Sequence, residues 1–116
     1  MSDISEAYTH IAYMQMELQQ YEEAEINYIN AIKIERSQIV TDNSVRLDGM
    51  DLAWILNLRS LIKMRQGQYK EADLLLSQSI SILNRLDKEE PGMYDEIIEN
   101  VNNNIKTVKK HLKAEN

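Results

Sequence analysis

The feature that most constrains the fold of this chain is a short segment that occurs twice. Gln20-Tyr21-Glu22-Glu23-Ala24 returns 48 residues later as Gln68-Tyr69-Lys70-Glu71-Ala72, and Ala31-Ile32-Lys33-Ile34 returns at the same distance as Ser79-Ile80-Ser81-Ile82. Apolar residues recur every three or four positions around both copies, which is typical of amphipathic α-helices. An internal repeat of helical units predicts a stack in which neighbouring units bury each other's apolar faces.

The same periodicity divides the chain into five helical segments. We expect one repeat over about residues 5–40 and a second over about 48–86, each a pair of antiparallel helices, followed by a long helix over about 91–115. A break is expected at Thr41-Asp42-Asn43-Ser44, where cap-forming residues gather, with the helix restarting between Ser44 and Gly49. Three glycines and one proline are too few for the tight turns of an all-β fold. The prediction is therefore an all-α domain of five helices over residues 1–116.

In these repeats the chain resembles the tetratricopeptide repeat family. Gln15 and Arg36 depart from the family pattern, which has a second tyrosine and a terminating proline there, so nothing stops the second helix early. The spacing of 48 residues exceeds the family's usual length of about 34 and resembles the longer repeats of kinesin-light-chain-like members, as does Leu56-Asn57. The resemblance implies a right-handed superhelical stack of two hairpins with a capping helix after Pro91. In the first repeat it rests on Tyr8, Ile11, Ala12, Tyr21, Ala24, Tyr28 and Ala31.

The register of the third helix stays open at this point. Arg59 and Lys63 occupy positions that the family pattern makes apolar. Sliding the helix by one residue would put Ile55, Leu58 and Ile62 in those positions, but it requires an extra residue in the turn at Gly67. The latter half of the second repeat fits the pattern better, through Gly67, Tyr69, Ala72, Leu76 and Ser79.

Residue types that carry catalysis or bind metals are scarce. The chain has no cysteine, and its two histidines, His10 and His111, lie near opposite ends of the sequence. The glycines are scattered, whereas a phosphate-binding loop gathers several at one helix start. We therefore expect no enzymatic activity, no metal site and no cofactor.

Charge and hydropathy narrow the range of partners. Nineteen acidic against thirteen basic residues leave a net charge of -6, which disfavours nucleic acid. No apolar run is long enough to span a bilayer, so we expect no membrane insertion. Residues 1–6 lack the basic and apolar regions of a secretory signal, and we expect a cytoplasmic protein.

What remains is recognition of a protein partner. In the unshifted register, the first helix of each hairpin would line a concave groove. Methionine and aromatic side chains suit contact with a peptide or an amphipathic helix. Family members that bind chaperone C-termini hold lysine and asparagine where this chain has Thr9 and Tyr13, so the resemblance does not extend to that carboxylate clamp. The expected groove residues are Thr9, Tyr13, Met16, Trp54, Asn57, Leu61 and Met64.

These observations predict an adaptor, scaffold or co-chaperone, with alternatives left open. The groove residues could equally be interior, covered by the last helix. The chain could also be one section of a longer array. A further alternative is an assembly module, in which the last helix forms a heptad-like seam with another copy. That seam would consist of Met93, Ile97, Val101, Ile105, Val108 and Leu112.

Overall fold

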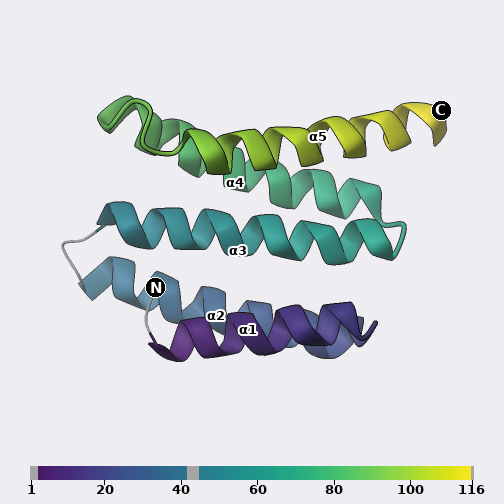
Figure 1. Cartoon of the computed structure of the whole chain (residues 1–116), viewed down its shortest axis with the longest axis horizontal. Helices are drawn as coiled ribbons and strands as arrows, with labels where there is room; N and C mark the ends of the chain where they lie inside the picture. The colour runs from purple at the N-terminus through teal and green to yellow at the C-terminus, as the bar shows by residue number, and fades with distance from the viewer. Residues whose placement is uncertain (1–2, 42–44, 116) are drawn as a thin grey trace.

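The computed structural model describes residues 3–41 and 45–115, and every regular element in these ranges is an α-helix. Figure 1 shows the helices running back and forth across the molecule, each antiparallel to the next. Within these ranges the prediction of an all-α fold with five helices is confirmed. The predicted break falls largely on residues 42–44, outside the described part. The helices are α1 (Asp3–Glu17), α2 (Tyr21–Thr41), α3 (Val45–Arg65), α4 (Tyr69–Glu89) and α5 (Asp95–Glu115).

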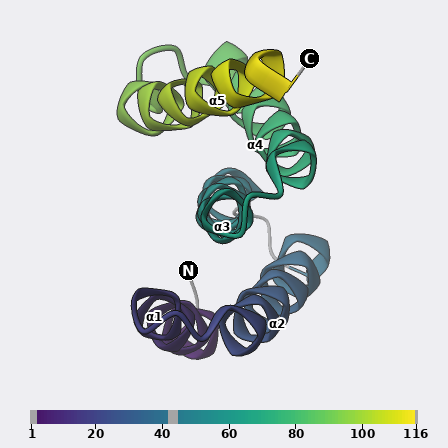
Figure 2. The ribbon, with the colours of Figure 1, turned by 90° about the vertical axis from the view of Figure 1, so that its right-hand side faces the viewer.

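Helix α3 lies in the middle of the molecule. It packs against α2 and α4 and touches α1 and α5, so within the described ranges it meets every other helix. Seen end-on in Figure 2, α1 and α5 lie on one side, α2 and α4 lie on the other, and α3 lies between them. From Leu52 to Ser60 every residue of α3 is buried except Trp54 and Arg59, which are half-buried. Because α3 packs against helices in several directions, its apolar residues are not confined to one side, which explains the weak amphipathic pattern of this segment.

Two apolar clusters hold the helices together on either side of α3. In the first, fully buried Met16 of α1, Tyr28 of α2 and Ile62 of α3 come together. In the second, Leu76 of α4 and Val101 of α5 pack beside residues of α3. The first cluster also includes Leu75 of α4, and both clusters take residues from at least three helices, so no hairpin buries its apolar side chains alone.

The turns that close the two hairpins have the same structure 48 residues apart. Gln19 has a φ of 64° and Gly67 a φ of 75°, both in the left-handed region that ends many helices. In both turns the following amide donates to a carbonyl oxygen five residues back, at 2.8 Å, from Gln20 to Gln15 and from Gln68 to Lys63. The turn at Gly67 therefore holds no extra residue, and the third helix keeps the unshifted register.

The two hairpins also cross at matching points. The Ser5 hydroxyl donates to the Ala31 carbonyl oxygen at 3.4 Å, and the Ser79 hydroxyl donates to the Ala53 carbonyl oxygen at 2.7 Å. Ser5 and Ala53 lie 48 residues apart, as do Ala31 and Ser79, so the two crossings use equivalent positions. In the first hairpin the serine is on the first helix and the alanine on the second, and in the second hairpin this order is reversed. All four residues are fully buried. Their small side chains let each pair of helices approach closely enough for a hydroxyl to reach the opposite backbone.

The last helix begins later than predicted. We expected it from about residue 91, with Pro91 in its first turn, but α4 continues to Glu89 and α5 begins at Asp95. Residues 91–94 form a turn in which Gly92 has a φ of 89°, and the Gly92 amide donates to Asp87 Oδ1 at 3.2 Å. A left-handed residue directly after the proline does not continue an α-helix, and the sequence interpretation overlooked this use of glycine.

Candidate functional site

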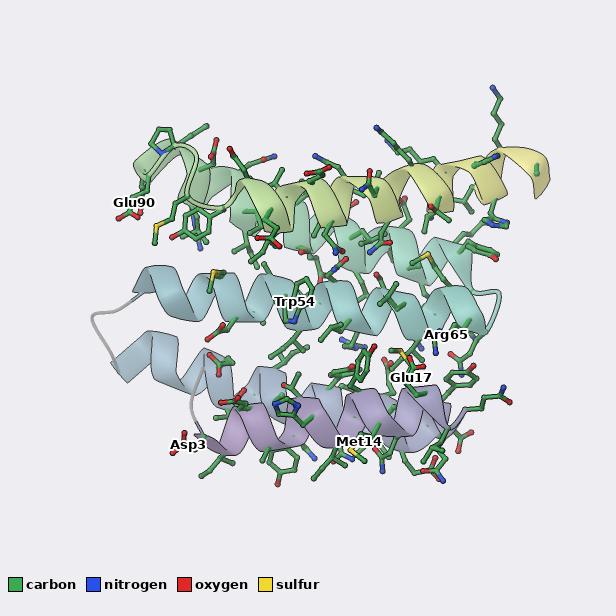
Figure 3. The ribbon with its side chains drawn as sticks, in the orientation of Figure 1. Asp3, Met14, Glu17, Trp54, Arg65 and Glu90 are labelled. Carbon is green, nitrogen blue, oxygen red and sulfur yellow. The ribbon has the colours of Figure 1, made fainter. Side chains whose placement is uncertain are left out.

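The expected groove residues belong to α1 and α3, and we name the side of the molecule formed by α1, α3 and α5 the α1/α3/α5 face. Tyr13 of α1 is 47% exposed, and Trp54 of α3 is half-buried. Figure 3 shows Trp54 midway along α3. Leu61 packs partly against the first apolar cluster and Met64 partly against the second. The face therefore presents two partly exposed aromatic side chains on neighbouring helices.

Three other expected residues are engaged within the chain. Met16 is fully buried in the first apolar cluster and reaches no surface. Asn57 is 1% exposed, because α5 covers it. The Thr9 hydroxyl donates to the Ser5 carbonyl oxygen of its own helix at 2.9 Å. The surface available to a partner is thus narrower than the sequence suggested.

A cluster of three asparagines joins α3 to α5. The Asn57 side-chain amide donates to Asn100 Oδ1 at 3.0 Å, and the Asn104 amide donates to Asn57 Oδ1 at 2.9 Å. Asn104 Nδ2 also lies 3.4 Å from Asn100 Oδ1. Asparagine is a poor interior residue for a helix. Here, however, Asn100 and Asn104, one turn apart on α5, form hydrogen bonds with the buried side chain of Asn57. The cluster fixes the position of α5 across α3.

A cavity of about 340 Å³ lies between α3 and α5 beside this cluster. Its apolar walls are Met50, Trp54 and Ile97, and two carboxylates, Asp51 and Glu96, also line it. Asp51 is 8% exposed, while Glu96 stands in solvent at the rim. The sequence interpretation missed both carboxylates. Asp51 lies three residues before Trp54, on the same side of a helix, but Glu96 joins them only through the placement of α5. Among the described residues, those that line the cavity are Met50, Asp51, Trp54, Glu96, Ile97 and Asn100.

An ion pair bridges α1 and α3 at the other end of the face. Arg65 Nη2 lies 3.1 Å from Glu17 Oε1, and both side chains are about half exposed, at 41% and 49%. Arg65 also donates to the Met16 carbonyl oxygen at 3.5 Å. Figure 3 shows Glu17 and Arg65 side by side between the two helices. This arginine is thus already neutralised by its own chain.

A second hollow, of about 570 Å³, lies on the opposite side of the molecule, among α2, α3 and α4. Its basic residues include Arg59 and Lys63, which the repeat pattern left unexplained. Arg59 donates to Glu25 Oε1 through Nε at 2.9 Å and Nη2 at 2.6 Å, and Lys63 Nζ lies 3.7 Å from the same oxygen. Although this hollow is larger, two of its basic residues, Arg59 and Lys63, are engaged in holding α2 to α3, and no tryptophan lines it. We therefore take the α1/α3/α5 face as the candidate site.

The heptad-like residues of α5 are engaged within the chain. Val101 and Val108 are fully buried against α4, and Ile97, Ile105 and Leu112 pack partly into the same cluster. Met93 precedes the helix and is 60% exposed. The apolar seam that an assembly of copies would need is therefore largely used to attach α5 to its own chain.

Three further observations concern metal-binding groups, membrane-spanning helices and similarity to known proteins. Among the described residues no group of three or more side chains is arranged to hold a metal ion. None of the helices in residues 3–41 and 45–115 combines the length and the apolar character needed to cross a bilayer. The chain matches no protein-family model, and no curated protein or solved structure is detectably similar to it.

Proposed function

We propose that the protein is a non-enzymatic interaction module, built as a tetratricopeptide-like superhelical stack, that binds a peptide or helix of a partner protein on its α1/α3/α5 face. The matched turns and matched crossings of the two hairpins support the repeat architecture. In such stacks the first helix of each hairpin lines the inner surface, where extended or helical segments bind. An adaptor or co-chaperone acting in the cytoplasm is the role that we infer.

One observation carries the proposal. Tyr13 and Trp54 remain partly exposed on neighbouring helices, although the core has buried aromatic residues as large as Tyr28 and Tyr94. Aromatic side chains contribute most of the binding energy at many protein interfaces, because they bury large rigid surfaces. Trp54 also lines the cavity between α3 and α5, which gives a partner side chain a place to enter.

The test is partner capture followed by titration. Proteins retained by the wild-type chain are identified, and the bound segment is then titrated against Tyr13→Ala and Trp54→Ala. We expect each change to weaken binding by about tenfold or more, as for interface hot spots. Leu74→Ala is the control, because Leu74 is 66% exposed and lines the opposite hollow. Equal binding by all four proteins would remove the face as the site.

A further inference from the structure

We propose that the outer side of α1 is a second docking site, on which an amphipathic helix of a partner protein packs as α2 packs on α3. Ile4, Ala7, Ile11 and Met14 follow one another at steps of three or four residues, so they lie along one side of α1. We name these four residues the outer stripe. Ile4, Ile11 and Met14 are 63%, 48% and 64% exposed, and Ala7 is also exposed. Figure 3 shows Met14 on the side of α1 that points away from α3.

This site is separate from the α1/α3/α5 face. Tyr13 lies two residues from Ile11, and residues two apart on a helix point in different directions. The inference therefore goes beyond the proposed function and does not rest on it.

The repeat shows how the equivalent side of α3 is covered. The counterparts of the outer stripe, 48 residues later, are Leu52, Ile55, Arg59 and Ile62. Leu52, Ile55 and Ile62 are buried in the first apolar cluster, which joins α3 to α2. Arg59 pairs with Glu25 of α2, at 2.6 Å from Nη2 to Oε1. The interface between α2 and α3 thus continues, by the repeat, to a helix position over α1.

A hollow marks the place of that helix. It has a volume of about 340 Å³, and the described residues that line it are Asp3, Ile4, Ala7, Tyr8 and Ile11. Tyr8 has Leu56 as its counterpart. Leu56 lines the larger hollow together with Ile29 and Ile32 of α2. A helix on α1 would place its own apolar residues over Tyr8 in the same way.

The chemistry of the occupant follows from a difference between the two surfaces. Where α3 has Arg59 to meet Glu25, α1 has Ile11. A carboxylate at the place of Glu25 would be desolvated beside Ile11 without gaining a cation. The partner helix therefore has an apolar residue there. Further apolar residues follow four and seven positions later, which is the spacing of Glu25, Ile29 and Ile32 in α2.

A second copy of the chain is a poorer occupant. A copy added head to tail would bring its α5 end to α1, and the exposed surface of α5 includes Asn103, Lys106 and Lys110. The α2 helix of each copy is already packed on its own α3. Docking gains free energy by burying the outer stripe, which requires an apolar surface opposite it. We therefore assign the site to a helix of another protein.

The test uses two helical probe peptides. Both are alanine-rich and carry a fluorophore, and the first has leucine at three positions with the spacing i, i+4 and i+7. The matched probe replaces the first leucine with glutamate, as in α2. Fluorescence anisotropy measures binding to the full chain. We expect saturable binding of the leucine probe, about tenfold tighter than that of the glutamate probe, because the carboxylate is desolvated without a partner.

The variant Ile11→Arg tests the position of the site. It gives α1 the residue type that α3 has at Arg59, so the preference should reverse and the glutamate probe should bind about tenfold tighter than the leucine probe. Met93→Arg is the control, because it makes the same change of charge at a side chain that is 60% exposed and lies outside α1. It should leave the preference for the leucine probe unchanged. Circular dichroism of each variant verifies that the helices are retained.

Three results would overturn the outer stripe as a docking site. They are no binding of the leucine probe, equal affinities for the two probes, and an unchanged preference in Ile11→Arg. Loss of leucine-probe binding in Tyr13→Ala or Trp54→Ala, with no effect of Ile11→Arg, would place the peptide on the α1/α3/α5 face and would also overturn it.

Light scattering separates the partner helix from a second copy. A dimer of the wild type that Ile11→Arg dissociates would assign the outer stripe to another copy and contradict the partner helix. We expect the same monomeric mass for both proteins. If capture of a partner proves independent of Tyr13 and Trp54, the proposed function fails, but the reversal of probe preference at Ile11 would still support this site.

Discussion

Tyr28 of α2 combines an apolar ring with a polar group that the fold does not use. The side chain is fully buried in the first apolar cluster, and its hydroxyl has no hydrogen-bond partner among the described residues. A buried hydroxyl without a partner loses its interaction with water and gains nothing in return. The ring is what stabilises the core, by its volume and its contacts.

The first prediction concerns this hydroxyl. Tyr28→Phe removes it and keeps the ring, so we expect the free energy of unfolding to stay equal or to rise by about 0.5–1 kcal/mol. Tyr28→Ala removes the ring and should cost about 3–5 kcal/mol. Urea denaturation of the three proteins measures both effects. A loss of more than about 1 kcal/mol in Tyr28→Phe would mean that the hydroxyl is hydrogen-bonded in solution.

The second prediction is a pH dependence. Burial raises the pKa of the Tyr28 hydroxyl above its ordinary value of 10.0, and the neighbouring Tyr13 adds to the rise. The folded state thus favours the neutral hydroxyl. The stability that the fold gains from this neutral hydroxyl is complete below pH 10.0, and it is lost as the pH rises above that value. We expect Tyr28→Phe to lose less stability than the wild type between about pH 8 and about pH 11. Urea denaturation at the two pH values measures the loss of stability of each protein. If the wild type and Tyr28→Phe lose the same amount, the prediction is contradicted.

At the scale of the helices, the left-handed residue of the two matched turns is glutamine in one and glycine in the other, which gives the third prediction. Gln19→Gly should raise the free energy of unfolding by about 1 kcal/mol, because glycine adopts a positive φ without steric cost. Gly67→Gln should lower it by about the same amount. A Cβ at Gly67 would meet no atom within 4 Å, so the penalty there comes from the backbone alone. Thermal unfolding of both variants tests the prediction, and a change of the same sign in both would refute it.

The contact between α2 and α3 gives the fourth prediction. Glu25 and Arg59 have side chains only 16% and 21% exposed, so removing one partner leaves the other charge poorly solvated. We expect Arg59→Leu to cost about 1–3 kcal/mol, and the double variant Glu25→Leu, Arg59→Leu to recover most of that loss. A double-mutant cycle by urea denaturation measures the coupling. Additive effects of the two substitutions would mean that the ion pair does not hold the helices together.

The fold was largely predictable because its signals are local. The repeated segments and the glycine at Gly67 lie within single hairpins, and they identified both hairpins. Arg59 and Lys63 were not explained in advance, because their partner Glu25 is on another helix, 34 residues away from Arg59, and periodicity does not report such a contact. The late start of α5 depends on the backbone of Gly92, which periodicity does not report.

The candidate site was less predictable, because it depends on how helices lie across one another. Periodicity put Met16 and Tyr13 on neighbouring parts of one helix, but it could not tell that the core covers the first and leaves the second exposed. Asn57 appeared suited to a partner until α5 supplied its own asparagines. The carboxylates of Asp51 and Glu96 are distant in sequence, and only the packing of α5 on α3 brings them to one cavity.

At the scale of the whole molecule, the two ends of the stack differ. Ile4, Ile11 and Ile26 at the α1 end are 63%, 48% and 59% exposed. Forty-eight residues later their counterparts are Leu52, Arg59 and Leu74, and the first two lie at the contact between the second hairpin and the first. The α5 end instead exposes polar residues, among them Asn102, Asn103, Lys106, Lys109 and Lys110. The exposed apolar side chains of α1 thus occupy positions that, in the second hairpin, contact the first hairpin. At the other end of the molecule, α5 presents a polar surface to solvent.

The last prediction follows from this asymmetry. Because Ile11 is 48% exposed and belongs to neither apolar cluster, Ile11→Gln should change the free energy of unfolding by no more than about 0.5 kcal/mol. Ile62→Ala, at a fully buried position of the first apolar cluster, should cost about 2–5 kcal/mol. Urea denaturation at low and high protein concentration measures both. If Ile11→Gln instead costs about 2 kcal/mol or more, and the loss grows with concentration, the α1 end is covered by another molecule in solution, since surface substitutions away from contacts have small effects.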